Sequence, residues 1–310
     1  MRLAFLGSGA FGLPTLEALH AGHELCAIVT QPDRPAGRKR VPTPTPVGAW
    51  AASHAPGVPL MKPEDLNADE PRAMLRDFDA DAWVIIAFGQ KLSERLLDGV
   101  FAINLHASLL PRWRGAAPIH RAIEAGDDET GNSVITIAQR MDAGDVLAQT
   151  RRPIEPHHTT GDLHDLLASD GPGAILTVLD QHARGAVVRT QQDESLVTRA
   201  RKLTKAEGTT DFALPADAVR ARIHAFNPWP GVTVLHHGSP IKLHRARTID
   251  RQTTAAPGTV LDAQAGHVAC ARGALEMLSV QPANKPAMAW SEFVNGHSIK
   301  AGERLEPMTP

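Results

Sequence analysis

Cysteine, long apolar runs and an excess of charge of either sign are all scarce in this chain of 310 residues. Its two cysteines, Cys26 and Cys270, lie far apart and show no metal-ligand spacing, so we expect buried, inert thiols rather than a disulfide or a zinc site. No apolar run approaches a membrane span, and the N-terminus lacks the apolar core and cleavage site of a signal peptide. These absences predict a cytoplasmic protein with no membrane segment and no bound metal.

The charge balance is almost even. A formal net charge of −2 provides no global attraction toward nucleic acid. Residues 205–310 carry 11 basic and 9 acidic side chains, whereas residues 1–204 carry 21 and 25. This small difference is compatible with a C-terminal part that faces a polyanion but does not by itself indicate one. With 43% hydrophobic and 21% charged residues, the composition is that of a globular protein, and its length favours two domains.

Three glycines near the N-terminus, Gly7, Gly9 and Gly12, form a G-x-G-x-x-G pattern between a predicted strand and a predicted helix. In dinucleotide-binding proteins this pattern is followed by an acidic residue at the tip of the second strand. Here Asp33 lies in a proline-flanked loop instead. A tight strand-to-helix turn with close packing explains the glycines without a nicotinamide cofactor, so we assign none.

An amide and an imidazole stand two residues apart at the end of another predicted strand. Because side chains alternate along a strand, Asn104 and His106 share one face. Ligands of parallel α/β sheets bind outside the carboxyl ends of the strands, where Asn can donate to an oxyanion and His can move a proton. The alternative is a strand end whose polar groups satisfy local backbone. The apolar run 81–89 predicts a strand buried on both faces, with room for a ligand at Gly89.

A carboxylate could complete this pair. The turn 138–145 follows a predicted strand and contains Asp142, which could orient His106 and stabilise its protonated form. Asp145 competes for that role, and turn formation alone would explain both residues.

Basic residues are concentrated in a stretch where proline and glycine disfavour regular structure. Four of the seven residues 34–40 are basic, which predicts an exposed and mobile loop. Such a loop is either a solvated surface segment or an arm that contacts phosphates.

The C-terminal third changes character after a polar stretch at residues 190–208. One predicted helix, 216–226, is followed by five short strand-like segments separated by glycine, proline and aspartate turns. This spacing is typical of a small antiparallel barrel of the OB type, which often presents a face to nucleic acid. Between the two parts we expect two separate amphipathic helices, 163–168 and 173–183.

Four motifs in this order resemble the methionyl-tRNA formyltransferase family over essentially the whole chain. They occupy residues 31–38, 104–119, 141–145 and 225–230. One departure is the first turn, which usually reads Gly-Thr-Pro-x-Phe in that family. The resemblance implies an α/β fold with a Rossmann-like formyltransferase domain over residues 1–189, a linker over 190–206, and an OB-like β-barrel that binds tRNA over 207–310.

The resemblance also implies the reaction and its residues. The formyl donor would be 10-formyltetrahydrofolate and the acceptor the α-amino group of methionyl-initiator-tRNA, for translation initiation, with no metal and no obligate protein partner. Asn104, His106 and Asp142 correspond to the catalytic trio. The expected folate-contacting residues are Phe88, Gly89, Ser108, Leu109, Leu110 and Pro111, and the expected tRNA-contacting residues are Arg38, Lys39 and Arg40.

Other functions stay open at this point. The same trio could serve a formyltransferase for a sugar amine or a formyl-folate hydrolase. A nicotinamide-dependent oxidoreductase would depend on the glycine pattern alone. A noncatalytic tRNA-binding protein would bind tRNA without modifying methionyl-tRNA.

Overall fold

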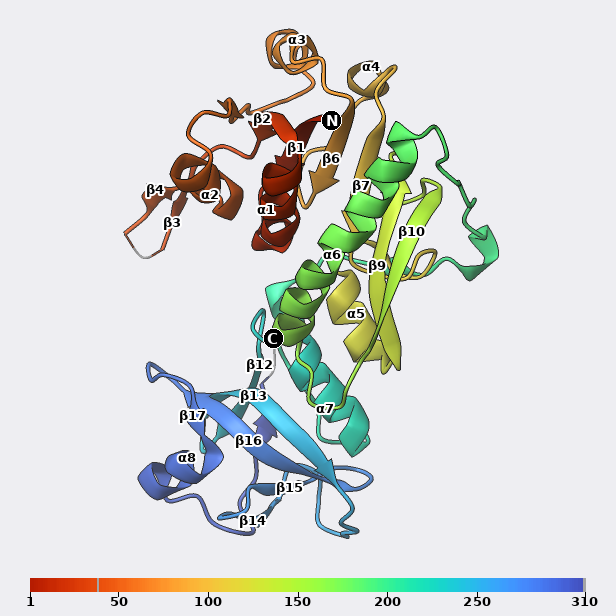
Figure 1. Ribbon diagram of the computed structural model, residues 1–310. Coiled ribbons are helices and arrows are strands. Elements are labelled where there is room, and N and C mark those ends of the chain that lie inside the picture. Colours follow the sequence, from red (N-terminus) through yellow and green to blue (C-terminus); the bar gives the residue numbers. More distant parts are fainter. Residues whose placement is uncertain (38, 309–310) are drawn as a thin grey trace. The chain divides into compact units, whose positions relative to one another are not determined.

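The computed structural model describes residues 1–37 and 39–308 and divides into two compact units (Figure 1). The first unit contains Met1–Gly115, Gly131–Arg152 and His164–Arg199, and the second contains Ala116–Thr130, Pro153–Leu163 and Ala200–Pro310. Neither unit is continuous in sequence, because residues 116–130 and 153–163 belong to the second unit. The domain limits predicted at residues 189 and 207 therefore stay predictions.

A seven-stranded sheet forms the centre of the first unit, in the order β10-β9-β7-β6-β1-β2-β5. Strands β1, β2, β5, β6 and β7 are parallel, and β9 pairs antiparallel with β7. The strand bounds are β1 Arg2–Gly7, β2 Glu24–Val29, β5 Leu60–Met61, β6 Ala82–Ile86, β7 Ala102–His106, β9 Glu129–Thr136 and β10 Val146–Pro153. Every residue of β6 is buried, as predicted for a central strand covered on both faces.

Helices and short elements surround this sheet. They are the 3₁₀ segments Ala10–Gly12 and Glu194–Leu196, α1 Leu13–Gly22, α2 Pro46–His54, α3 Asp69–Asp77, α4 Glu94–Leu97 and the C-terminal part of α6 Thr160–Ala183. Figure 1 shows α1 and α6 on the same face of the sheet. Gly171 of α6 lies close to the sheet and to α1, since a Cβ at this position would be 2.6 Å from Leu105 Cδ2 of β7 and 3.2 Å from Thr15 Oγ1 of α1. A larger residue at position 171 would require the Leu105 side chain to move.

The α6 helix corrects the prediction of two separate helices. Its 24 residues continue through Pro172 without a break. Buried residues lie on both sides of the proline, including Leu167, Ile175 and Leu179. Packing of one continuous apolar face therefore outweighs the hydrogen bond that the proline removes.

The glycine pattern of the first turn is explained by close packing. A Cβ at Gly7 would lie 2.6 Å from the Phe5 ring and 2.8 Å from the Ile86 carbonyl oxygen, and one at Gly12 would lie 3.0 Å from Phe5. Asp33 forms an ion pair with Lys62, with 2.6 Å between Oδ1 and Nζ. Gly7 and Gly12 therefore serve the packing of strand and helix, whereas a Cβ at Gly9 would make only an ordinary contact of 3.5 Å with Ala87.

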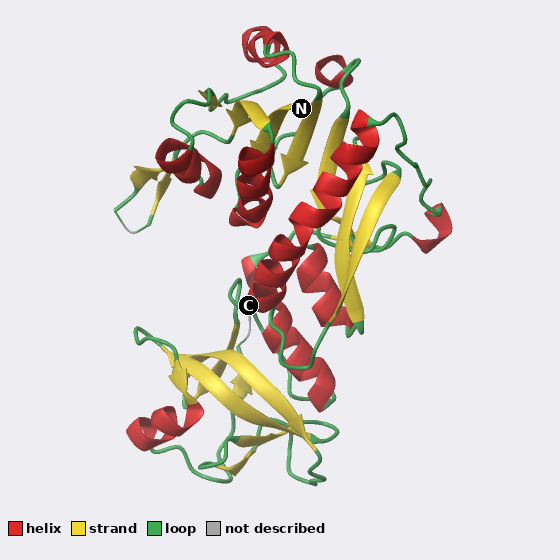
Figure 2. Ribbon diagram, in the orientation of Figure 1, coloured by secondary structure: helices red, strands yellow, loops and turns green. Residues whose placement is uncertain are grey.

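The predicted irregular basic loop is instead a small hairpin, which Figure 2 shows as a separate pair of strands. Strand β3 (Arg34–Ala36) pairs antiparallel with β4 (Val41–Thr43). The prediction was wrong because Pro35 and Pro42 face each other in a two-stranded ribbon, where no central strand needs their missing N–H groups. Arg38 lies outside the described residues, while Lys39 and Arg40 are exposed at the tip.

The second unit contains a curled antiparallel sheet in the order β14-β15-β16-β13-β12-β18, with β17 paired to β16. Its strands are β12 Val232–His236, β13 Ser239–Ile249, β14 Val260–Asp262, β15 His267–Ala269, β16 Ala274–Pro282, β17 Met288–Ala289 and β18 Glu306–Pro307. Its helices are α5 Pro118–Ala125, α7 Ala216–Ala225, α8 Trp290–His297 and the 3₁₀ segment Lys205–Glu207. In the first unit, the two-residue strand β8 (Arg114–Gly115) pairs with β11 (Arg199–Ala200), which begins at the last residue of that unit.

Backbone hydrogen bonds join the two edges of this sheet. Val260 N–H donates to Glu303 O and Leu305 N–H donates to Gly258 O, each at 2.8 Å, just before the chain enters β18. The sheet thus curls back on itself, and the predicted combination of a Rossmann-like α/β domain with an OB-like sheet is confirmed. Within residues 1–37 and 39–308, no helix has the length and apolar character needed to cross a membrane.

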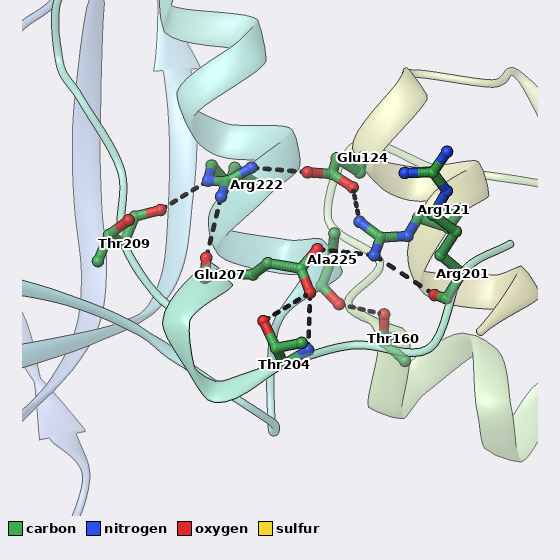
Figure 3. Close-up of polar contacts among 9 residues, drawn as sticks. All are labelled: Arg121, Glu124, Thr160, Arg201, Thr204, Glu207, Thr209, Arg222 and Ala225. Atoms are coloured by element: carbon green, nitrogen blue, oxygen red, sulfur yellow. Dashed lines mark hydrogen bonds and ion pairs between the residues drawn. The ribbon is translucent and has the colours of Figure 1, made fainter. Parts of the chain in front are cut away.

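Charged side chains connect the helices of the second unit to the segment that precedes its barrel (Figure 3). Glu124 of α5 accepts from Arg121 and from Arg222 of α7, both at 2.6 Å. Arg121 also donates to the carboxylate of Glu207 at 2.6 Å, and Arg222 donates to the Glu207 carbonyl at 2.9 Å. These half-buried contacts fix α5 and α7 against residues 204–209.

Candidate active site

The carboxyl ends of the parallel strands β1, β6 and β7 meet at one edge of the first sheet. The register places Gly7 opposite Ile86 and Ile85 opposite Asn104. Asn104 and His106, the last polar residues of β7, therefore emerge at the edge where α/β sheets bind ligands. Ile103 and Leu105 are buried on the opposite face, as alternation along the strand requires.

The structure brings His106 and Asp142 together. His106 Nδ1 lies 3.6 Å from Asp142 Oδ2, and the exposed fractions of the two side chains are 7% and 15%. His106 Nε2 donates to the backbone carbonyl oxygen of Trp113 at 2.9 Å. Both ring nitrogens thus face oxygen atoms, and an imidazolium, which carries a proton on each nitrogen, can donate to both.

Backbone contacts fix the position of Asp142. Its φ of 55° lies in the left-handed region, and its Oδ2 accepts from the Gly115 N–H at 2.8 Å. Its carbonyl oxygen accepts from Gln192 Nε2, also at 2.8 Å. Among the described residues only Asp142 pairs with His106, and Asp145 binds Thr136 Oγ1 through its backbone N–H.

A buried arginine supports this arrangement. The Arg114 side chain is 1% exposed, and its Nε donates to Gln192 Oε1 at 2.9 Å. Its terminal nitrogen pairs with Glu194 at 2.9 Å, and Arg140 pairs with the same carboxylate. Hydrogen bonds from Arg114 and then Arg140 lower the pKa of Glu194 to about 2. Gln192 and Glu194 were not predicted as site residues; they fall within the predicted linker but lie in the first unit.

Asn104 is half-buried, and within the described part of the chain its side-chain amide makes no hydrogen bond to another residue. The alternative that the polar groups of this strand end satisfy local backbone therefore holds for His106, which donates to the Trp113 carbonyl oxygen, but not for the Asn104 amide. Its N–H groups are free to donate to a ligand.

The segment 108–111 is held by internal hydrogen bonds. Ser108 is fully buried and its hydroxyl donates to the Arg112 carbonyl oxygen at 2.7 Å. The Leu110 N–H donates to Ser133 Oγ at 3.0 Å, and Gln149 donates to the Leu110 carbonyl oxygen at 3.0 Å. Ser108 thus positions the turn, whereas Leu109 and Pro111 are half-buried and keep atoms at the surface. Folate contacts at these residues stay predictions.

The two residues predicted at the end of β6 differ in exposure. Phe88 is 2% exposed and packs in the core, and its carbonyl oxygen accepts from Ser8 Oγ at 3.1 Å and Gln31 Nε2 at 3.2 Å. Gly89 is exposed with φ of 89°, a value that favours glycine. Of these two residues, Gly89 is therefore accessible to a ligand, whereas the Phe88 side chain is not.

A cavity of about 1050 Å³ opens on the first unit. Its apolar lining includes Leu92, Leu97 and Ile137, and its polar lining includes Lys91, Gln139 and Arg140. Residues 137–140 lead directly into the turn that holds Asp142. This lining was not predicted from the sequence, because most of its residues come from two separate segments, 91–99 and 137–140, which show no motif of their own.

Comparison with known proteins identifies the family. The family model described as formyl transferase matches residues 1–179, and that described as its C-terminal domain matches residues 202–298. A methionyl-tRNA formyltransferase from Methylococcus capsulatus is 42% identical over 309 residues, covering 98% of this chain and 99% of the relative.

Solved structures show the same fold. An N-formyltransferase from Helicobacter canadensis, in complex with folinic acid and dTDP-3-aminofucose, has a TM-score of 0.68 at 12% identity, covering 89% of this chain and 99% of that chain. HypX from Aquifex aeolicus with tetrahydrofolic acid has a TM-score of 0.65 at 16% identity, covering 95% of this chain and 47% of that chain. This chain thus spans about half the length of HypX. The matched models and the relative from M. capsulatus show that the chain belongs to the formyl transferase family, as its motifs indicated.

Proposed function

We propose that this protein transfers a formyl group from 10-formyltetrahydrofolate to the α-amino group of methionyl-initiator-tRNA. The observation that carries the proposal is the pairing of His106 with Asp142, at 3.6 Å, next to the unengaged amide of Asn104 at the end of β7. Membership of the formyl transferase family and the relative from M. capsulatus support this choice of reaction.

The chemistry requires three functions from the site. A neutral amine attacks the formyl carbon, and the tetrahedral oxyanion that forms then expels the folate nitrogen. Asn104 donates a hydrogen bond to this oxyanion, a contribution typically worth ~10²–10³-fold in rate. Because the Asn104 amide has no partner to release within the described chain, it is available for this contact.

His106 moves the proton from the amine toward the leaving nitrogen. A ring nitrogen of His106 must offer its lone pair to a proton of the substrate amine. Because Nδ1 faces Asp142, this nitrogen is Nε2, where the amine takes the place of the Trp113 carbonyl oxygen. Asp142 stabilises the protonated ring and keeps its orientation. The Gly115 N–H and Gln192 hold Asp142 so that His106, not the carboxylate, adapts to the substrate.

The cavity beside residues 137–140 is the proposed site for the folate donor. Leu92, Leu97 and Ile137 can cover a flat pterin ring, while Lys91 can bind a carboxylate of the glutamate tail, away from the acidic side chains of Glu94 and Asp98 in the same lining. The rim of the cavity joins the turn of Asp142, which would bring the formyl group near the trio.

The exposed hairpin and the barrel are the proposed contacts for tRNA. Lys39 and Arg40 project at the hairpin tip, and Arg38 belongs to the same segment in the sequence. Lysine and arginine bind phosphates without reading the sequence, so these residues would position the acceptor stem. We also propose a cytoplasmic location, where charged initiator tRNA is used, with no obligate protein partner.

A panel of acceptors tests the proposal. The protein is incubated with 10-formyltetrahydrofolate and, separately, methionyl-tRNA, an amino-sugar nucleotide or buffer alone. We expect N-formylmethionyl-tRNA as the main product. Formylation of the sugar instead, formate released without an acceptor, or tRNA binding without product would each contradict it.

A further inference from the structure

Three side chains in the second unit converge on one point that the proposed reaction does not use. His236 ends β12, His237 is the first residue of the turn to β13, and Glu303 lies just before β18. Their ligand atoms all lie within 4.8 Å of one another. We propose that His236, His237 and Glu303 form a binding site for a divalent transition-metal ion of the zinc class.

The backbone presents the two imidazoles side by side. The turn between β12 and β13 has two central residues, His237 with φ of 48° and Gly238 with φ of 75°, which is the tight hairpin geometry. The rings of His236 and His237 lie 4.3 Å apart between centroids. The tight turn therefore directs both rings toward the same carboxylate.

Glu303 is held in place by hydrogen bonds before any ion binds. Its Oε2 accepts from the Lys300 N–H at 3.0 Å, and its backbone carbonyl oxygen accepts from Val260 at 2.8 Å. The adjacent cation, Arg304, is engaged by the carbonyl oxygen of Pro257 at 2.9 Å.

The distances suit a tetrahedral ion after a small adjustment. Bonds of about 2.0–2.2 Å to zinc place neighbouring ligand atoms roughly 3.3 Å apart. His237 Nε2 lies 3.4 Å from Glu303 Oε1, which already fits. His236 Nε2 lies 2.8 Å from Oε2 through a hydrogen bond, so this pair must separate when the ion replaces the proton. The neutral His236 ring then carries its proton on Nδ1, and water can fill the fourth position.

The donor set selects the class of ion. Two imidazoles and one carboxylate favour Zn²⁺, Co²⁺ or Ni²⁺, whereas Mg²⁺ and Ca²⁺ prefer oxygen ligands. The ion would join the β12–β13 turn to Glu303, whose backbone carbonyl oxygen accepts one of the hydrogen bonds that join the two edges of the curled sheet. Its effect is therefore stabilisation of the barrel, independent of formyl transfer.

Zinc titration of the chelator-treated full chain tests the site. By calorimetry we expect one Zn²⁺ per chain at this site and no comparable binding of Mg²⁺, with a rise in Tm on addition of Zn²⁺. His237→Asn and Glu303→Gln should each weaken Zn²⁺ binding at least about tenfold and remove the rise in Tm. Asn is chosen at 237 because it tolerates a positive φ.

Matched variants and Co²⁺ complete the experiment. His157→Ala and Glu306→Gln change an exposed histidine and an exposed carboxylate outside the site, and should bind Zn²⁺ as the parent does. Co²⁺ should give the visible absorption of a tetrahedral site in the parent and lose it in His237→Asn. Absence of a one-to-one complex, or equal Zn²⁺ affinity in the parent, His237→Asn and Glu303→Gln, would overturn the proposal.

Discussion

At the scale of single residues, the site depends on groups that hold a catalytic side chain rather than on that side chain alone. Asp142 faces His106 because the Gly115 N–H binds its carboxylate and Gln192 binds its carbonyl oxygen. Motif recognition identified His106 and Asp142 but not Gln192. A glutamine in a polar stretch shows no pattern, and only folding brings it against a turn fifty residues away.

The two candidate carboxylates allow a sharp test at this scale. Asp142→Asn removes the negative charge opposite His106 while the amide oxygen can still accept from Gly115, so we expect turnover to fall at least roughly 100-fold in a protein that stays folded. Asp145→Asn should retain near-normal turnover, since Asp145 does not pair with His106. Steady-state kinetics of both variants checks this, and equal losses would remove Asp142 from its assigned role.

A buried histidine outside the site predicts a pH effect on stability. His224 of α7 is 1% exposed, and burial, then the charges of Arg220 and Arg245, lowers its pKa from 6.5 to about 4. Between these values the unfolded chain binds the extra proton, so the free energy of unfolding falls as the pH falls. We expect about 2 kcal/mol of loss from this residue between pH 7.5 and pH 5.

Urea unfolding at the two pH values measures this effect. His224→Gln should show a loss smaller by that amount, because glutamine does not titrate, while the exposed His157→Gln should behave as the parent. The same pH dependence in His224→Gln and in the parent would show that His224 is not the group responsible.

At the scale of elements, predictions from the local sequence pattern were confirmed where one type of hydrophobic pattern dominated a segment. The apolar run 81–89 predicted β6, and the short segments after residue 230 predicted the strands of the barrel. Predictions from local pattern were wrong at α6 and at the β3–β4 hairpin. Proline locally disfavours both elements, but the packed helix tolerates Pro172 and the two-stranded ribbon tolerates Pro35 and Pro42. The His236, His237 and Glu303 cluster was also missed, since its residues show no ligand spacing in sequence.

The β3–β4 hairpin predicts a dependence on salt. Lys39→Ala combined with Arg40→Ala should raise the KM for methionyl-tRNA with little change in kcat, because these cations would contact phosphates. The slope of log affinity against log salt should fall by about one for each cation that contacts a phosphate. Arg184→Ala, an exposed cation at the end of α6, is the matched control. An unchanged KM and slope would leave the hairpin as a solvated surface element.

The ionic contacts between α5 and α7 predict a stability difference. Glu124→Ala leaves the half-buried Arg121 and Arg222 without a shared carboxylate, which should cost roughly 1–3 kcal/mol of unfolding free energy. Asp180→Ala removes an exposed helical pair with Arg184 and should cost well under about 1 kcal/mol. Denaturant unfolding of the two variants compares them directly, and equal costs would argue against the network as a structural contact.

At the scale of the whole molecule, the fold class and the family could be predicted from the sequence. The chain segments that make up each compact unit could not. Residues 116–130 and 153–163 belong with the C-terminal barrel in the second unit, although they precede the predicted linker. The contacts of Glu124 with Arg222, and of Thr160 with the Ala225 carbonyl oxygen, join segments far apart in sequence. No local pattern predicts such pairing, because the paired residues lie 65 or more positions apart in the sequence.

The central claim is that Asn104, His106 and Asp142 act together on the formyl group. Single-turnover transfer from 10-formyltetrahydrofolate to methionyl-tRNA, with protein in excess, measures this step apart from product release. We predict that the parent forms N-formylmethionyl-tRNA and that Asn104→Ala and His106→Ala slow the step at least roughly 100-fold. A folded His106→Ala variant that forms product as fast as the parent would contradict the account.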